Sequence, residues 1–356
     1  MIESNNAMPI LAAAKMGATL MKRYTRNGKE VRGKPPLFMG ASGAGKSAIA
    51  ATVVRGILAE HEGLEVGDDE GEFKFWDLRL QTVDAPDVRG LPKVEDDLSV
   101  WCPPDWLPKA GESGLFLIDE INAVTDKSIM FALYQLIQDR AIGNYKLPAG
   151  VYVMACANRD IDSEGLEDLP APLRQKFWVK EVVPTLVDWR DHAIEVGLDI
   201  RIIASAVAYP ELVTDWDGQV EEQQSTGREL SACSDALFNW EREGHTKSGL
   251  RELFAGFVGY VAATKIATMV TQFSDLIPVS KIVESPKSAP LPESFDMECA
   301  LAVSLANCAD RNNLEAMITY LGRIQRQEVT ALFRCVLLKS KGNAHHSNAY
   351  DEFVAV

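Results

Sequence analysis

The stretch Gly40-Ala41-Ser42-Gly43-Ala44-Gly45-Lys46-Ser47 matches the pattern G-x-x-x-x-G-K-[S/T] at every fixed position. It follows a short apolar run at 36–39 and precedes a helix-forming stretch at 48–54. A strand, a glycine-rich loop and a helix in this order are the context in which the pattern binds phosphate groups. The sequence therefore predicts that this loop binds a nucleoside triphosphate.

Phosphate oxygens would be surrounded by backbone N–H groups of the loop and by the positive end of the following helix. Lys46 would reach the β- and γ-phosphates, and the Ser47 hydroxyl would coordinate Mg²⁺. We expect ATP and Mg²⁺ as cofactors, although these residues do not distinguish ATP from GTP. The predicted nucleotide-contacting residues of this loop are Gly40, Ala41, Ser42, Gly43, Ala44, Gly45, Lys46, Ser47 and Ala48.

A second motif, Gly114-Leu115-Phe116-Leu117-Ile118-Asp119-Glu120, is an apolar run that ends in two carboxylates. Such a run is typical of a buried strand whose carboxyl end delivers acids to a site. Asp119 would hold Mg²⁺ directly or through water. Glu120 would polarise the attacking water, because a carboxylate beside it can accept the proton.

A third motif begins with the strand-like run at 151–157 and continues Asn158-Arg159-Asp160. An amide at the end of a strand near the γ-phosphate can orient the lytic water or sense the phosphate. An asparagine after a strand is also a common turn residue. Only its order after the first two motifs favours the functional interpretation of Asn158.

The chain alternates apolar runs with helical stretches in its first half, which predicts βαβ units and a parallel sheet. We therefore predict an α/β fold: a P-loop NTPase three-layer αβα sandwich with a parallel five-stranded sheet, an α-helical lid and a helical C-terminal extension. The expected strands are 36–39, 73–80, 114–119, 150–157 and 177–183. The expected regions are an N-terminal helix and linker at 1–34, the nucleotide-binding core at 35–183, the lid at 184–283, and the linker and extension at 284–356.

Composition limits the partners that the chain can bind. It has 36 Lys and Arg against 51 Asp and Glu, a formal charge of −15, which argues against nucleic acid in general. Its densest basic stretch, 22–34, is interpreted as the solvated flanks of an N-terminal helix. The six cysteines show no metal-binding spacing, which predicts reduced core thiols and a cytoplasmic protein. No apolar run is expected to span a membrane.

Together these segments resemble an AAA+ ATPase of the MoxR-like, dynein-related group found in bacteria and phages. The resemblance runs through most of 35–275. It implies a homo-oligomeric ring, with six subunits as the expected number, and it assigns Asn158 as the sensor 1 residue. The segments that carry it are 77–80, 86–92, 101–108, 119–123 and 133–140.

The resemblance also implies an arginine finger that acts on the nucleotide of the neighbouring subunit, near Leu173-Arg174-Gln175-Lys176-Phe177. Related proteins commonly have Arg-Phe here, whereas this chain has Lys176 before Phe177. Arg174 is favoured, because a planar guanidinium suits phosphate oxygens better than a point charge, and Arg140 is a lesser interface candidate. The catalytic set is then Lys46, Glu120, Asn158 and Arg174.

The stretch Ser225-Thr226-Gly227-Arg228 resembles the sensor 2 segment at the start of a lid helix, with Gly227 where proline is usual. Arg228 would reach the γ-phosphate from the lid. The segment 83–108 corresponds to an inserted hairpin or loop that faces the ring pore in the family. Its Trp101 and Trp106 either grip a partner or pack internally, and packing is favoured.

Three functions compete. The first is an Mg-ATPase ring that remodels or matures a protein client, acting with a von Willebrand factor A-type partner as MoxR-like proteins do. The second is a nucleic-acid motor or GTP-driven restriction-type subunit, against which the net charge argues. The third is a nucleotide-dependent scaffold with little turnover, against which the Asp119-Glu120 pair argues.

Overall fold

The computed structural model describes residues 7–124, 126–159, 169–215, 224–339, 350 and 353. These residues form two compact units, and the chain passes from the first to the second between Val183 and Pro184. This point coincides with the predicted end of the nucleotide-binding core.

The first unit is built on a parallel sheet whose described strands lie in the order β1-β12-β4-β11-β8-β5. Every neighbouring pair runs parallel. The five predicted strands are confirmed, but the number five is wrong, because β1 adds a sixth strand beside β12. A three-residue strand is too short to show a periodic pattern in the sequence. The strands are β1 (Ala7–Pro9), β4 (Pro36–Met39), β5 (Phe73–Arg79), β8 (Ser113–Asp119), β11 (Gly150–Ala157) and β12 (Trp178–Val183).

Helices cover both faces of this sheet, so the three-layer P-loop sandwich is confirmed. Alternate strand residues point to opposite faces. Phe38 and Leu117 share a buried cluster with α1 and α3, whereas Leu37 and Ile118 share one with α5. The helices of this unit are α1 (Ile10–Met21), α2 (Lys46–Ile49), α3 (Arg55–Glu62), α4 (Ala85–Arg89), α5 (Lys127–Asp139) and α6 (Ala171–Arg174).

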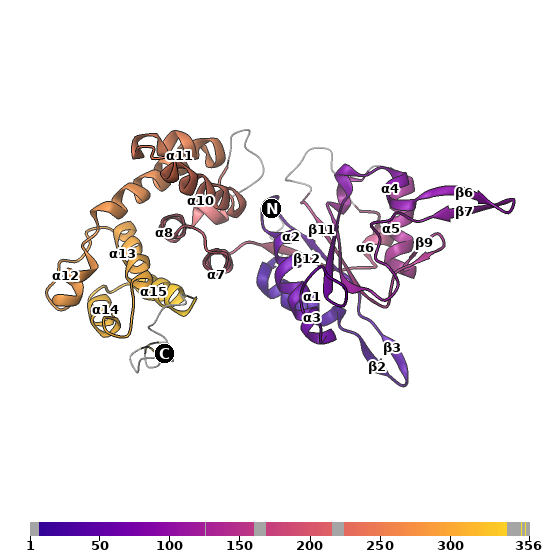
Figure 1. Ribbon diagram of the computed structural model, residues 1–356, viewed down its shortest axis with the longest axis horizontal. Coiled ribbons are helices and arrows are strands. Elements are labelled where there is room, and N and C mark those ends of the chain that lie inside the picture. The colour runs from indigo at the N-terminus through magenta and orange to yellow at the C-terminus, as the bar shows by residue number, and fades with distance from the viewer. Residues whose placement is uncertain are drawn as a thin grey trace. The chain divides into compact units, whose positions relative to one another are not determined.

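Among the residues that the structure describes, three small hairpins accompany the sheet: β2 (Tyr24–Arg26) with β3 (Lys29–Val31), β6 (Leu91–Glu95) with β7 (Leu98–Cys102), and β9 (Ala141–Ile142) with β10 (Tyr145–Lys146). Figure 1 shows β2–β3 and β6–β7 projecting from the body of the first unit. The segment 22–34 is solvated as predicted, since β2 and β3 are largely exposed. Its interpretation as helix flanks is wrong, because its centre pairs as the β2–β3 hairpin.

The second unit is helical in the part that the structure describes, as predicted. The lid and extension regions share one buried cluster, in which Val207 and Met269 join Leu301 and Phe333. The helices are α7 (Leu186–Val196), α8 (Ile200–Ala208), α9 (Glu211–Thr214), α10 (Gly227–Arg242), α11 (Leu250–Gln272), α12 (Val279–Glu284), α13 (Phe295–Asn307), α14 (Leu314–Leu321) and α15 (Gln327–Lys339).

One described helical segment, Lys247–Asp275, is long and apolar enough to cross a membrane. The expectation that no run reaches this length is therefore wrong. Within the segment, α11 departs from helical geometry at Gly259, where φ is 75° and ψ is 163°. Phe254 and Ile266 are buried in a cluster with residues of α8 and α10. This part of α11 therefore packs inside the second unit, whereas Tyr260 and Val261 are exposed.

Candidate functional site

The glycine-rich loop joins β4 to α2 at the carboxyl edge of the sheet. Gly40 follows the strand, and a Cβ atom placed there would lie 2.7 Å from the backbone oxygen of Val182. Gly45 caps α2 with a φ of 84°, a conformation that only glycine adopts without cost. Two of the motif's glycines are therefore required by the backbone itself.

Lys46, the first residue of α2, is buried, and its side chain is held by acceptors of the loop and of Asn158. Its Nζ donates to the backbone oxygens of Gly40 and Ala41, each over 2.8 Å, and to Oδ1 of Asn158 over 3.0 Å. A buried ammonium group needs such acceptors, because desolvation is costly. The structure thus brings the predicted phosphate-binding lysine and the predicted sensor residue into direct contact.

Ser47 and Asp119 meet in the same way. The Ser47 hydroxyl donates to Oδ2 of Asp119, which is nearly buried at the end of β8. Mg²⁺ is coordinated by oxygen atoms such as those of hydroxyl and carboxylate groups. Water and substrate phosphates complete its coordination shell. The two side chains therefore fit the predicted metal-binding role.

Glu120 directly follows β8 in a left-handed conformation with a φ of 57°. Its backbone N–H donates to Oδ1 of Asp119 over 2.9 Å. A non-glycine residue in this region is uncommon, and such conformations cluster at functional sites. At this turn the backbone leaves the direction of β8, so Glu120 lies outside the strand that positions Asp119.

Asn158 follows the carboxyl end of β11 and is buried. The side chain of Asn122 makes two hydrogen bonds to its backbone: Nδ2 donates to the Asn158 oxygen over 2.9 Å, and Oδ1 accepts from the Asn158 N–H over 3.2 Å. No role was predicted for Asn122, although it lies two residues after Glu120 in the segment 119–123, one of those that carry the family resemblance. Asp160, the last residue of the third motif, lies outside the described residues.

Arg79 is a second residue that the sequence analysis missed. It ends β5 and lies opposite Asp119 in the strand register. A hydrogen bond to Asp77 raises its pKa, and the negative charges of Asp77, Asp119 and Glu120 act in the same direction. The signal available in the sequence was a charged residue near the end of the predicted strand 73–80, which comes before the strand that ends in Asp119.

Comparison with known proteins finds similarity in structure only. No family model matches the chain, and no curated protein matches it. A structure of RuvB from Thermotoga maritima is 15% identical, with 88% of this chain and 86% of that chain covered and a TM-score of 0.37. NtrX from Brucella abortus in complex with ATP is 15% identical, with 93% and 67% covered and a TM-score of 0.39. These scores carry no functional argument, so the assignment rests on the site itself.

The two candidates for the arginine finger differ in their surroundings. Arg174 ends α6 with an exposed side chain. Lys176 is half-buried, and its Nζ lies 5.8 Å from the centre of the Tyr134 ring in the same subunit. A cation over an aromatic face is held there by the charge distribution of the ring. Arg174 is therefore the more exposed of the two candidates.

Arg140 has an internal structural role. Its NH2 group donates to the backbone oxygens of Pro148, over 2.8 Å, and Val151, over 2.6 Å. Burial, with the nearby charge of Arg32, lowers the pKa of Arg140 to about 10. These contacts hold the turn before β11 and do not favour Arg140 as an interface residue.

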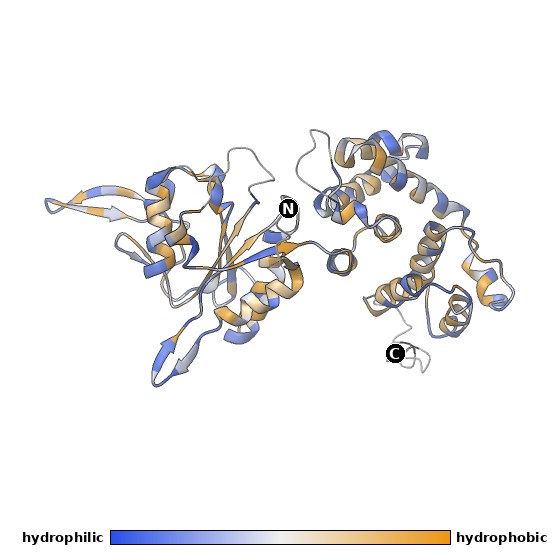
Figure 2. Ribbon diagram, turned by 180° about the vertical axis from the view of Figure 1, so that it is seen from behind, coloured by the Kyte–Doolittle hydropathy of each residue, from blue (hydrophilic) through white to orange (hydrophobic). Residues whose placement is uncertain are grey.

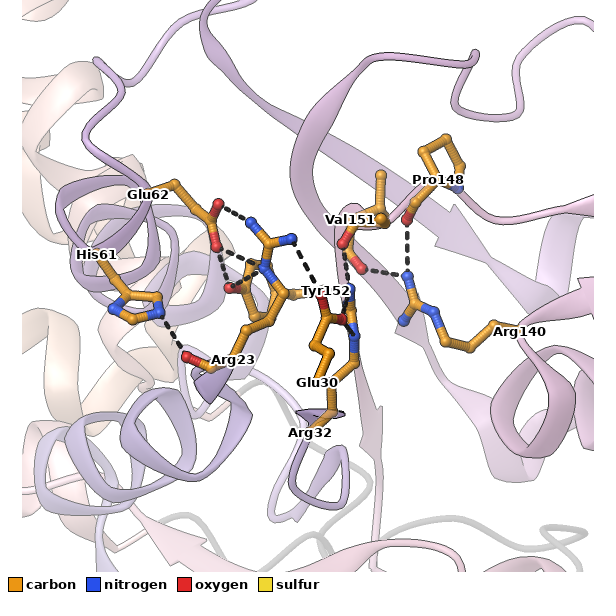
Figure 3. Close-up of polar contacts among 10 residues, drawn as sticks. Arg23, Glu30, Arg32, His61, Glu62, Arg140, Pro148, Val151 and Tyr152 are labelled. Carbon is orange, nitrogen blue, oxygen red and sulfur yellow. Dashed lines mark hydrogen bonds and ion pairs between the residues drawn. The ribbon is translucent and has the colours of Figure 1, made fainter. Parts of the chain in front are cut away.

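Another polar cluster lies at the start of β11, the end of the strand away from Asn158 (Figure 3). Arg23 Nε donates to Glu62 Oε1 over 2.9 Å and to the Tyr152 hydroxyl over 3.2 Å, and Tyr152 also donates to Glu62. Burial would raise the pKa of Glu62, but these hydrogen bonds outweigh it, so the pKa is lowered. The cluster attaches the segment after α1 to α3 and the sheet.

Arg228 lies in the second unit, in the first turn of α10, and its side chain is exposed. Thr226 caps this helix by accepting a hydrogen bond from the Glu229 N–H. A Cβ atom at Gly227 would lie 2.6 Å from the Trp189 ring, which explains glycine where proline is usual in the resembling family. The helix start that the sequence predicted at this position is present.

The two tryptophans of the inserted segment differ. Trp106 packs internally: its ring stacks on Phe116 with 5.9 Å between centres, and its Nε1 donates to the Asp87 oxygen over 3.1 Å. Trp101 lies in the β6–β7 hairpin, is 37% exposed and is covered on one side by Arg89. Figure 2 shows hydrophobic and hydrophilic colour mixed along this hairpin. Its exposed apolar residues include Leu91, Val94 and Leu98.

Proposed function

We propose that this protein is an Mg-dependent ATPase of the AAA+ class. The observation that carries the proposal is the convergence of Lys46, Ser47, Asp119 and Asn158 at one edge of the parallel sheet, through direct hydrogen bonds between their side chains. Four motif residues separated by up to 112 positions form one polar site. If the glycine-rich loop were only a turn of small residues that binds no ligand, these four side chains would not need to meet.

Each side chain has a role in hydrolysis. The loop N–H groups and the N-terminus of α2 would bind the phosphates, and Lys46 would leave the Gly40 and Ala41 oxygens to contact them. Mg²⁺ held by Ser47 and Asp119 would neutralise the charge that develops on phosphate oxygens. Glu120 would accept a proton from the attacking water, and Asn158 would orient that water.

Within this class, we favour the MoxR-like group and assembly into a homo-oligomeric ring, with six subunits as the expected number. The exposed Arg174 side chain supports action on a neighbouring subunit's nucleotide. Such an arginine contributes about 10³–10⁵ in rate in other systems. In the proposed ring, Arg228 on α10 would respond to the nucleotide state, that is, to whether a γ-phosphate is present.

The proposed partner is a protein client, together with a von Willebrand factor A-type protein, in the cytoplasm. The formal charge of −15 supports protein partners over nucleic acid. The β6–β7 hairpin supports the same view, because exposed Leu91, Val94 and Leu98 offer apolar contacts.

Phosphate release from ATP and GTP in the presence of Mg²⁺ tests the proposal. Glu120→Gln is expected to slow turnover by about 10²–10⁴-fold while nucleotide binding is kept, and Lys46→Ala is expected to lose binding. Wild type and Glu120→Gln turning over at the same slow rate would contradict the proposal and favour a scaffold. Stimulation by DNA would favour a nucleic-acid motor. Proteins captured by ATP-loaded Glu120→Gln, but not by Lys46→Ala, would identify the client.

A further inference from the structure

We propose that Asn122 is a positioning residue that fixes the position of Asn158 relative to the turn at Glu120. This inference rests on the proposed hydrolysis. A single side chain makes both hydrogen bonds to the Asn158 backbone, one to its oxygen over 2.9 Å and one from its N–H over 3.2 Å. Asn122 is 4% exposed and Asn158 is 8% exposed. Little of either residue is in contact with water.

The need for this contact follows from where the sheet ends. The register of β11 with β8 ends at Ala155 opposite Ile118, and that with β4 ends at Ala157 opposite Met39. Asn158 comes one residue later, where its buried backbone groups still require partners. The amide of Asn122 supplies a donor and an acceptor there, as a further strand would. It thereby extends the ordered edge of the sheet to the residue that carries the predicted sensor amide.

The same contact joins two parts of the reaction site. Asn122 lies in the 3₁₀ turn Ile121–Ala123, which begins at Glu120 and is closed by a hydrogen bond from the Ala123 N–H to the Glu120 oxygen. Asn158 Oδ1 in turn accepts from Lys46. The residue that orients water and the residue that accepts its proton are therefore held together by one pair of hydrogen bonds. Small displacements of reacting groups lower rates strongly.

This role predicts a loss in turnover without a matching loss in nucleotide binding, because the phosphate-binding loop does not include Asn122. A merely structural asparagine would instead lower stability and leave the turnover of the folded protein unchanged. Asn122→Ala removes both hydrogen bonds. Asn122→Asp has the same shape and keeps the acceptor for the Asn158 N–H, but it loses the donor to the Asn158 oxygen. The matched control is Asn144→Ala, which removes a 3.0 Å hydrogen bond from an exposed asparagine to the Trp101 backbone oxygen.

The experiment measures kcat, KM and nucleotide affinity for the wild type and each variant, with melting temperature as the test of folding. We expect kcat to fall about 10²-fold in Asn122→Ala and to fall in Asn122→Asp, with affinity changed by less than about threefold, a factor worth under 1 kcal/mol. Asn144→Ala is expected to match the wild type. Because both residues act through one group, the double variant Asn122→Ala/Asn158→Ala is expected to be no slower than Asn158→Ala alone.

Hydrogen exchange of the backbone amide at Asn158 gives a readout independent of turnover. We expect faster exchange in Asn122→Ala and retained protection in Asn122→Asp, which keeps the acceptor. Folded Asn122→Ala with wild-type kcat, or a fully additive double variant, would overturn the proposal. A wild type that hydrolyses no nucleotide would instead contradict the proposed function, while the exchange result would still show whether Asn122 holds Asn158.

Discussion

Replacing Asn158 with aspartate tests whether Lys46 must leave its present partners to bind phosphate. Lys46 Nζ donates to Asn158 Oδ1 over 3.0 Å, and both residues are less than 10% exposed. Aspartate keeps the shape of asparagine but places a negative charge against the ammonium group. The variant should therefore hold Lys46 more strongly in the nucleotide-free site and should also repel the phosphates.

The magnitude follows from this geometry. At an effective dielectric constant of about 20, opposite unit charges about 3 Å apart attract by about 5 kcal/mol. Burying the carboxylate offsets several kcal/mol of this attraction. A remaining preference of about 1–3 kcal/mol corresponds to about 5–150-fold weaker nucleotide binding.

Titration of a fluorescent ATP analogue in the presence of Mg²⁺ measures this effect, with Asn158→Ala as the control. Removing only the neutral acceptor should leave affinity within about threefold of the wild type, under 1 kcal/mol. The aspartate variant should bind more weakly than both. If folded Asn158→Asp binds the nucleotide as tightly as the wild type, Lys46 does not have to exchange Asn158 for phosphate, and the reasoning is refuted.

Three further outcomes are expected. Gly40→Ala should lower the free energy of unfolding by about 1–3 kcal/mol in urea denaturation, because its Cβ would lie 2.7 Å from the Val182 oxygen; unchanged stability would contradict this close approach. The lowered pKa of Glu62 means that its contribution to stability is present above its unfolded pKa and is lost as pH falls through the folded value. Arg23→Ala should therefore weaken the acid dependence of unfolding, and an unaltered pH profile would disagree. Arg174→Ala should lower hydrolysis by about 10³-fold or more while binding is kept, and mixing it with Glu120→Gln subunits should restore activity if the arginine acts between subunits.

Local sequence patterns predicted much of the fold and the site. The apolar runs before the glycine-rich loop and before Asp119 are buried strands, because β-branched and apolar side chains fill both faces of a parallel sheet. The positive φ angles of Gly43 and Gly45 are local requirements of backbone geometry, whereas glycine is needed at position 40 because the Val182 oxygen of a distant strand lies close to it. β1 was missed because a run of three residues that ends in Pro9 shows no alternation, and it becomes a strand only by pairing with β12. The surroundings of Trp101 and Trp106 likewise depend on which distant residues lie beside them.

The sequence by itself determined the chemical groups: a lysine and a serine at the start of a helix, two carboxylates at the end of one strand and an amide after another. Their spacing along the chain also determined their order, since each motif carries its own short-range backbone signal. Only the tertiary structure decided which groups touch. Lys46 contacts Asn158 because β4 and β11 are neighbours in the sheet, and Asn122 contacts Asn158 because the strand ladder ends one residue too early. Contacts of this kind depend on strand order and on where pairing stops, which are properties of the whole sheet and not of any segment.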